Sequence, residues 1–269
     1  MPLFGRPRYP SPYRELADPG PLLVEHVAYG PAEDQHVELR RPAAGTEVKG
    51  VAMLLHGGFW HEVWRCDSLN TLAVALAMRG WHAWNIEYRR VKRRGDAWPG
   101  LLDDVAAAAV PVHDEPEFAD LPVVAVGHSA GGQLALWLAS KLHRAGRRID
   151  GVVGLAAISD LRAAAALQLG NGAVRDLLGG SPDDVPDRYA AADPMDALPI
   201  GTRILLVHGS EDEAVPPAMS REFAAAAATA GDTVQLMELT GVGHSALVDP
   251  SQPFWPEISA WMERPPGIE

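Results

Sequence analysis

Short apolar runs recur along most of the chain, and a segment with helical spacing follows nearly every one of them. Runs with almost no polar residue are typical of strands that are buried on both faces of a sheet, and here they span residues 51–55, 123–126, 152–156 and 204–207. Two further segments with strand character span residues 81–88 and 234–239. Helices are predicted at residues 67–79, 98–110, 130–144, 217–230 and 253–263, the first with Asp67 as its N-cap. This alternation predicts an α/β fold with a mostly parallel central sheet and helices on both faces.

Two departures from the alternation set the limits of the domain. Residues 22–30 and 36–41 alternate between apolar and polar positions, which predicts an antiparallel pair of strands at one edge of the sheet. Residues 158–200 break the rhythm with prolines and paired glycines, which predicts a small cap inserted into the domain. We therefore expect one domain over residues 22–264, preceded by a proline-rich extended arm (1–21) and followed by a short tail (265–269).

Composition and charge narrow the class of protein. The chain has 269 residues, of which 47% are hydrophobic and 22% charged, as expected for one large globular domain. A net charge of −12 argues against nucleic acid or an anionic membrane as a partner. No apolar stretch is long enough to span a bilayer, and the single cysteine, Cys66, allows no intrachain disulfide. A cytoplasmic location is therefore expected, and a homodimer through apolar helices at the sheet edge is compatible with the sequence.

The first candidate for chemistry is the segment GHSAGG, residues 127–132, between a predicted strand and a predicted helix. Glycines weaken regular structure, so their concentration here indicates that the backbone must turn tightly. The segment fits the G-x-S-x-G nucleophile elbow, in which small residues make room for a strained, exposed serine. Ser129 is therefore the candidate nucleophile.

A serine hydroxyl needs a base to take its proton, and the base needs a carboxylate that orients it. His244 lies in the glycine-rich loop GVGHS after the last predicted strand. Asp212 lies in HGSEDEAVP after the strand that ends at residue 207, with Glu211 and Glu213 as rival acids. The order Ser129, Asp212, His244 along the chain is the α/β-hydrolase order.

Donors for an oxyanion hole are expected in the segment HGGFW, residues 56–60, which follows the buried strand 51–55. Glycines there let backbone N–H groups approach the oxygen on which negative charge develops. Gly58 and Phe59 are the predicted donors, together with Ala130 directly after the nucleophile.

Aromatic residues near this segment suggest a pocket wall. Trp60 and Trp64 follow the oxyanion loop, and His128 precedes the nucleophile, so we expect these three side chains to line the substrate pocket. The ten histidines do not form an H-E-x-x-H motif, and no cysteine pair is present, so no metal site and no cofactor are predicted.

These motifs together resemble the α/β-hydrolase superfamily over about residues 22–264. The combination of HGGFW, GHSAGGQLA, HGSEDEAVP and GVGHS is similar to the esterase/lipase branch with its carboxylesterases and arylformamidases (kynurenine formamidases), and more distantly to peptidase-like hydrolases. The aromatic residue of HGGFW is typical of the formamidases, whereas related esterases usually have HGGG. The resemblance implies a serine hydrolase without a cofactor.

The sequence therefore predicts an enzyme that cleaves small to medium carboxylic esters through a Ser-His-Asp acyl-enzyme mechanism. Hydrolysis of N-formylkynurenine-type formamides is the alternative reaction. A non-catalytic binding protein on the same fold is the alternative from another class, although such proteins typically lack the nucleophile or the base. The expected partner is a small-molecule ester or formamide.

Overall fold

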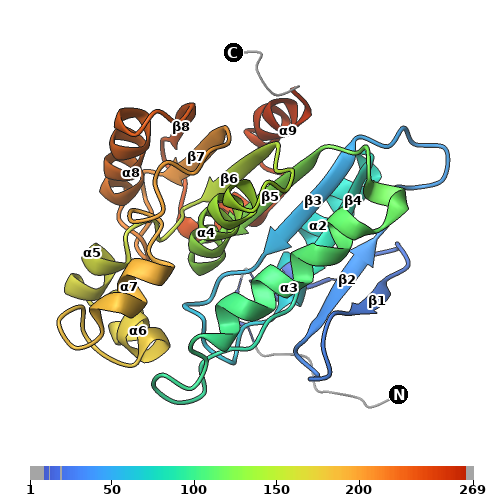
Figure 1. Ribbon diagram of the computed structural model, residues 1–269. Coiled ribbons are helices and arrows are strands. Elements are labelled where there is room, and N and C mark those ends of the chain that lie inside the picture. Colours follow the sequence, from blue (N-terminus) through green and yellow to red (C-terminus); the bar gives the residue numbers. More distant parts are fainter. Residues whose placement is uncertain (1–8, 12, 19, 265–269) are drawn as a thin grey trace.

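A single eight-stranded sheet organises the molecule (Figure 1). The computed structural model describes residues 9–11, 13–18 and 20–264. The strand order is β1-β2-β4-β3-β5-β6-β7-β8; β2 pairs antiparallel with β1 and with β4, and the other neighbouring strands pair in parallel. The strands are β1 (Glu25–Ala28), β2 (His36–Arg40), β3 (Gly50–Leu55), β4 (Trp81–Ile86), β5 (Val123–His128), β6 (Gly151–Leu155), β7 (Ile204–Gly209) and β8 (Val234–Leu239). The predicted mostly parallel sheet with an antiparallel edge pair is confirmed.

Helices cover both faces of the sheet because each central strand is apolar on both sides. Along β3, Val51 and Met53 enter one buried core, whereas Ala52 and Leu54 enter the other. The first core is closed by α3 (Gly100–Asp114), α4 (Ala130–Arg144) and α8 (Pro217–Thr229). The second is closed by α2 (Asn70–Met78) and α9 (Trp255–Glu263). Figure 1 shows α3 and α4 lying across the front of the sheet.

Two helix ends differ from the sequence prediction. The segment predicted to start with Asp67 as N-cap begins as a 3₁₀ turn, η1 (Cys66–Leu69), and the α-helix starts only at Asn70. Asp67 does not cap this turn, because it lies within it and Arg65 occupies the N-cap position; its carboxylate instead accepts a hydrogen bond from the Tyr9 hydroxyl. Helix α3 continues past residue 110, through Pro111 to Asp114. Burial of Val112 in the core favours this extra turn despite the hydrogen bond that proline removes.

The predicted insertion between β6 and β7 contains three short helices, α5 (Leu161–Ala166), α6 (Leu169–Leu178) and α7 (Pro186–Ala192). Figure 1 shows them grouped at lower left, away from β1 and β2. The start of α6 is irregular: Gln168, Gly170, Asn171 and Gly172 all have positive φ. The insertion therefore forms a compact cap with a strained turn facing the rest of the domain.

The described part of the N-terminal segment packs against the domain more closely than an extended surface arm would. It contains the one-turn helix α1 (Tyr13–Leu16), and the side chains of Tyr9 and Leu16 are buried. Residues 1–8 of the predicted arm and the predicted tail 265–269 lie outside the described residues.

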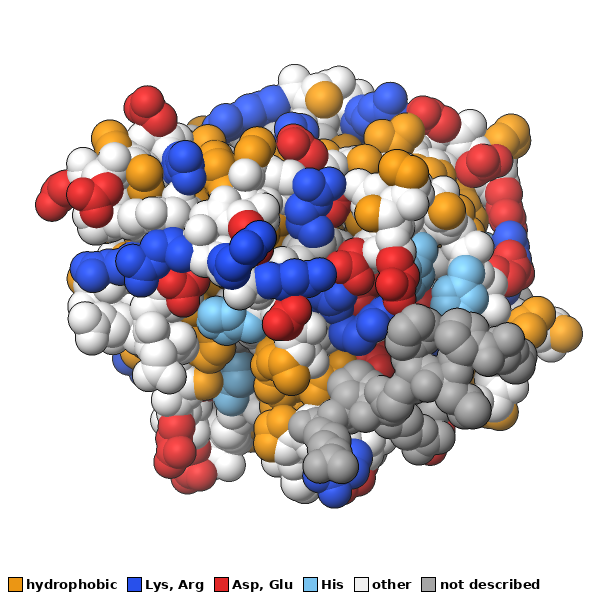
Figure 2. Space-filling model, turned by 90° about the horizontal axis from the view of Figure 1, so that it is seen from below, with side chains coloured by type: hydrophobic (Ala, Val, Ile, Leu, Met, Phe, Trp, Pro, Cys, Tyr) orange, Lys and Arg blue, Asp and Glu red, His pale blue; other side chains and the backbone are white. Residues whose placement is uncertain are grey.

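Within the described ranges, no helix combines the length and apolar character that crossing a membrane requires. On the face in Figure 2, basic and acidic side chains are interleaved.

Candidate active site

Ser129 occupies a strained turn between β5 and α4. Its backbone has φ 57° and ψ −119°, a conformation that residues other than glycine rarely adopt. The flanking glycines are required by close packing: a Cβ at Gly127 would lie 2.0 Å from the carbonyl oxygen of Gly131, and a Cβ at Gly131 would lie 2.0 Å from that of Leu55. The glycines of GHSAGG thus permit a turn that larger residues would open.

Asp212 and His244 meet at the ends of β7 and β8. His244 Nδ1 lies 2.6 Å from Asp212 Oδ2, and the other carboxylate oxygen accepts the N–H groups of Ala214 and Val215 at 2.8 Å each. Burial would raise the pKa of Asp212, but hydrogen bonds from His208 and His244 outweigh burial and lower it well below its usual range. Asp212 is therefore an ionised, fixed acceptor for the imidazole.

His208, to which no role was assigned from the sequence, contacts the carboxylate of Asp212. Its Nε2 lies 2.9 Å from the carbonyl oxygen of Val215 and 3.3 Å from Asp212 Oδ2, so this nitrogen carries the proton. The Ser220 hydroxyl lies 2.7 Å from Nδ1, to which it donates. The only signal in the sequence is a histidine at the end of an apolar strand.

His128 connects the nucleophile turn to the loop of the base. Its Nε2 donates to the carbonyl oxygen of His244 at 3.1 Å, and the two imidazole rings lie 4.5 Å apart. Burial, followed by the proximity of His244, lowers the pKa of His128 well below its usual value. A neutral His128 therefore links the turn that contains Ser129 to the loop that contains His244. The Ser129 hydroxyl makes no hydrogen bond to His244 here; such bonds often tighten only when substrate binds.

The loop that is predicted to carry the oxyanion donors passes directly beside Ser129. A Cβ at Gly57 would lie 3.1 Å from the Cβ of Ser129. Gly58 and Phe59 both have positive φ, and in the described part of the chain their N–H groups donate to no backbone carbonyl. Ala130 is the first residue of α4, so its N–H has no acceptor within the helix. In the described part of the chain, the predicted donors Gly58, Phe59 and Ala130 therefore have N–H groups without a backbone acceptor, on residues adjacent to Gly57 and Ser129.

Glu87 has a buried carboxylate that was not singled out from the sequence, and it contacts His56 at the start of the segment HGGFW. His56 Nε2 lies 3.2 Å from one Glu87 oxygen, and the guanidinium of Arg90 lies 3.1 Å from the other. Burial would raise the pKa of Glu87, but the hydrogen bond from His56 and the charges of Arg90 and Arg65 outweigh it and lower the pKa to about 2. The signal available in the sequence was an acid between Ile86 and Tyr88, directly after the strand.

The predicted pocket role of Trp60 is not supported. Its side chain is fully buried, and its indole N–H donates to Gln133 Oε1 at 3.1 Å. Gln133 lies on α4 and also donates to the carbonyl oxygen of Ala192 in the cap, at 2.9 Å. Trp60 therefore belongs to the core beneath the loop, because its positive φ turns the indole inward. The adjacent Phe59 instead faces the cap, close to Gly170.

Trp64 is half-buried and lies in an aromatic cluster near the site. Its ring stacks on Tyr9 at 5.1 Å, and the edge of Tyr13 meets it at 4.8 Å. Tyr13 in turn lies 6.2 Å from the ring of His128. Burial, and then the charge of Asp212, raise the pKa of Tyr13. The N-terminal segment thus brings a neutral phenol close to His128, which was not predicted from the sequence.

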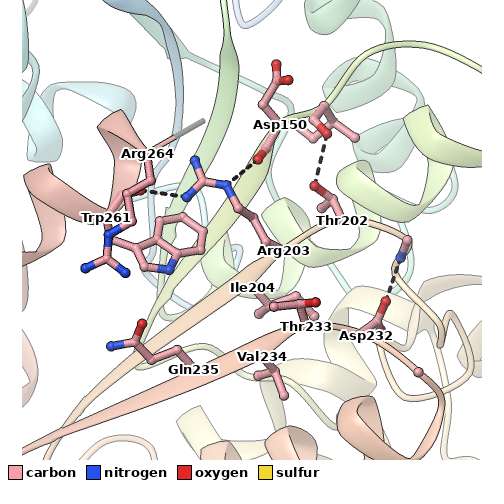
Figure 3. Close-up of a pocket in the computed structure, with 13 residues that line it drawn as sticks. Asp150, Thr202, Arg203, Ile204, Asp232, Thr233, Val234, Gln235, Trp261 and Arg264 are labelled. Carbon is pink, nitrogen blue, oxygen red and sulfur yellow. Dashed lines mark hydrogen bonds between the residues drawn. The ribbon is translucent and has the colours of Figure 1, made fainter. Parts of the chain in front are cut away.

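The cavity in Figure 3 is separate from these residues. It has a volume of about 820 Å³ and lies where β6, β7 and β8 begin, at the opposite ends of the strands from Ser129. The Arg203 guanidinium lies over the Trp261 ring there, 4.1 Å from its centroid. None of the predicted site residues lines this cavity.

The strand order, the elbow after β5 and the acid and histidine after β7 and β8 define an α/β-hydrolase. The sequence matches the prolyl oligopeptidase family (peptidase S9) over residues 68–262, and the chain belongs to this family. The match includes Ser129, Asp212 and His244 but not the oxyanion loop. No curated protein sequence matches the chain.

Solved structures with the same fold include several esterases, all of low sequence identity to this chain. A bacterial heroin esterase has a TM-score of 0.74 at 21% identity, with 93% of this chain and 86% of that chain covered. Esterase B from Lactobacillus rhamnosis has a TM-score of 0.72 at 18% identity, with 90% and 85% covered. A bifunctional GH43-CE protein from Bacteroides eggerthii has a TM-score of 0.71 at 19% identity over 88% of this chain, which spans 37% of that protein. The predicted α/β-hydrolase fold is confirmed.

Proposed function

We propose that this protein is a serine hydrolase that cleaves small to medium carboxylic esters. The observation that carries the proposal is the contact of 2.6 Å between His244 Nδ1 and Asp212 Oδ2, beside a serine with the backbone strain of a nucleophile elbow. Esterase relatives of the same fold and membership of a hydrolase family support the same reaction class.

In the proposed mechanism, His244 Nε2 takes the Ser129 proton as the serine oxygen attacks the ester carbonyl carbon. Asp212 accepts from Nδ1, so it fixes the tautomer and stabilises the imidazolium that forms. The N–H groups of Gly58, Phe59 and Ala130 donate to the oxyanion. His244 gives the proton to the leaving alcohol, and the acyl group stays on Ser129. Water then attacks the acyl carbon while His244 takes its proton, and the bond to the Ser129 oxygen breaks as His244 returns the proton, which releases the carboxylic acid and free Ser129.

The substrate class follows from the surroundings of the site. Trp64, Tyr13 and Phe59 supply apolar surface, and the cap of three short helices is too small for a large interfacial lid. A short acyl group or an aromatic group fits this environment better than a long lipid chain. We therefore place soluble esters first among the substrates.

Replacement of the nucleophile tests the proposal. Ser129→Ala should lower kcat on p-nitrophenyl acetate by roughly 10⁶-fold, because proton transfer and attack both need the hydroxyl. Circular dichroism and thermal unfolding should match the wild type. A fluorophosphonate probe should label the wild type at Ser129 and leave the variant unlabelled. An unreactive wild type would favour the non-catalytic binding protein instead.

Formamide hydrolysis is the second candidate, and the aromatic cluster of Tyr9, Tyr13 and Trp64 favours it. The deciding measurement is kcat/KM on N-formylkynurenine against p-nitrophenyl esters of rising acyl length. A ratio strongly in favour of the formamide would make the protein an arylformamidase. Fast ester cleavage with negligible formamide turnover would make it a carboxylesterase.

A further inference from the structure

Two histidines and a glutamate share one face of the edge hairpin formed by β1 and β2. In the antiparallel register His26 lies directly opposite Glu38, and His36 precedes Glu38 by two residues, so all three side chains leave the same face. One ligand atom of each lies within 4.8 Å of the others. His26 is exposed, and the other two are half-buried. The groups are therefore close together and open to solvent.

The hydrogen bonding of His36 prepares it as a ligand. Its Nδ1 lies 2.8 Å from the carbonyl oxygen of Glu33. A carbonyl oxygen can only accept, so Nδ1 carries the proton and Nε2 keeps its lone pair. Metal-binding histidines commonly donate their second ring N–H to a carbonyl in this way. The ring of His26 lies 5.5 Å from that of His36, so both imidazoles can reach one ion.

Glu38 supplies an anionic oxygen to the same space. Its Oε2 lies 3.4 Å from the guanidinium of Arg40, which is buried and also donates to Asn70. This long contact keeps a positive charge near the carboxylate without using both of its oxygens. One oxygen of Glu38 therefore stays available to a cation.

We propose that His26, His36 and Glu38 form a transition-metal site, with Zn²⁺ as the ion that best suits two imidazoles and one carboxylate. Ligand atoms of a tetrahedral zinc site lie about 3.3 Å apart, since each lies about 2 Å from the ion. The exposed side chain of His26 can close the remaining separation by rotation. Three protein ligands leave the fourth position for water, and a bound ion would clamp β1 onto β2.

The proposed site is distinct from the catalytic site. Strands β1 and β5 are four steps apart in the sheet, or about 19 Å at the usual strand spacing. The ion would therefore stabilise the edge of the sheet and take no part in ester cleavage. The sequence analysis predicted no metal because the ligands come from two strands and form no contiguous motif.

Isothermal titration of the chelator-treated full-length protein with ZnCl₂ tests the proposal. We expect one Zn²⁺ per chain at the hairpin. His26→Ala and His36→Ala should each weaken Zn²⁺ binding at least about 100-fold. Loss of the hydrogen-bond partner of a metal ligand already weakens binding by about 10- to 100-fold, and loss of the ligand itself should weaken it more. His143→Ala, which removes an exposed histidine outside the cluster, is the matched control and should bind as the wild type does.

Thermal unfolding and spectroscopy give independent readouts. Saturating Zn²⁺ should raise the Tm of the wild type and of His143→Ala, but not that of the His26→Ala/His36→Ala double variant. Bound Co²⁺ should show the intense visible absorption of tetrahedral coordination. Equal Zn²⁺ affinity of the double variant and the wild type, or no stoichiometric binding by the wild type, would overturn the proposal.

Discussion

At the scale of single residues, three adjacent acids differ in what surrounds them. Asp212 accepts hydrogen bonds from His244, Ala214 and Val215, and its side chain is fully shielded from solvent. Glu211 and Glu213 are exposed. In the described part of the chain, Asp212 is therefore the acid of these three whose carboxylate contacts the imidazole of His244.

Asp212→Asn should lower kcat by about 10⁴-fold, because an amide cannot hold the imidazole in the required tautomer or stabilise its charged form. Glu211→Gln, the matched control in the same loop, should change kcat by less than about twofold, as expected for an exposed surface substitution. Steady-state kinetics on p-nitrophenyl acetate checks both. The reverse order of effects would assign the orienting acid to Glu211.

Residues with a local signature could be predicted from the sequence, and residues defined by their partners could not. The spacing of GHSAGG predicted the tight turn that the structure has at Ser129, because a nucleophile elbow requires glycines at fixed positions. Glu87 and His208 have no such signature: each acts through side chains that only the folded sheet brings to it. Trp60 was assigned to the pocket from its position in the sequence, beside the predicted oxyanion donors. In the structure its positive φ turns the indole into the core, and the sequence does not indicate that backbone conformation.

At the scale of elements, Gln133 joins three parts of the molecule. It lies on α4 directly after the elbow, accepts from Trp60 in the oxyanion loop and donates to Ala192 at the end of α7. The positions of the oxyanion loop and the cap are therefore coupled through one buried amide.

Gln133→Ala should lower the free energy of unfolding by about 2–4 kcal/mol, because it leaves two buried polar groups without partners. It should also lower kcat, since the loop that carries Gly58 and Phe59 loses its anchor. Trp137→Phe is the matched control: it removes the hydrogen bond to Ala191 in the cap and the contact of Lys141 with the indole ring, but no bond to the loop of Gly58 and Phe59. It should cost about 1 kcal/mol with little change in kcat. Urea unfolding and steady-state kinetics measure both. Equal kcat for the two variants would contradict the coupling.

At the scale of the whole molecule, the sheet assembles the site from distant parts of the sequence. Apolar periodicity predicted the strands, and the chemistry at their ends predicted the nucleophile, base and acid. Periodicity does not specify which strands pair, nor that Tyr9 and Tyr13 fold back onto the site. Such long-range contacts depend on packing between surfaces that a single sequence leaves undefined.

The buried network of Glu87 predicts how the stability of the molecule depends on pH. The pKa of Glu87 lies at about 2 in the folded protein, below its ordinary value of 4.5. The stabilisation by the ionised group is therefore complete above about pH 4.5 and is lost as the pH falls toward 2. Glu87→Gln should lower the free energy of unfolding at pH 7 by roughly 3 kcal/mol, because it removes the buried carboxylate that pairs with Arg90 and Arg65 and leaves Arg90 with Asp34 as its remaining acidic partner.

Urea unfolding of the wild type and of Glu87→Gln at a series of pH values from 7 to the acid limit of folding measures this effect. The difference in free energy of unfolding between the two proteins should shrink steadily below about pH 4.5, because the stabilisation by ionised Glu87 is lost there. The other acids titrate equally in both proteins and cancel in the difference. Glu62→Gln, which changes an exposed glutamate, should follow the wild type throughout. A difference that stays constant down to the acid limit would show that the amide loses packing rather than charge, and that the oxyanion loop does not depend on an ionised Glu87.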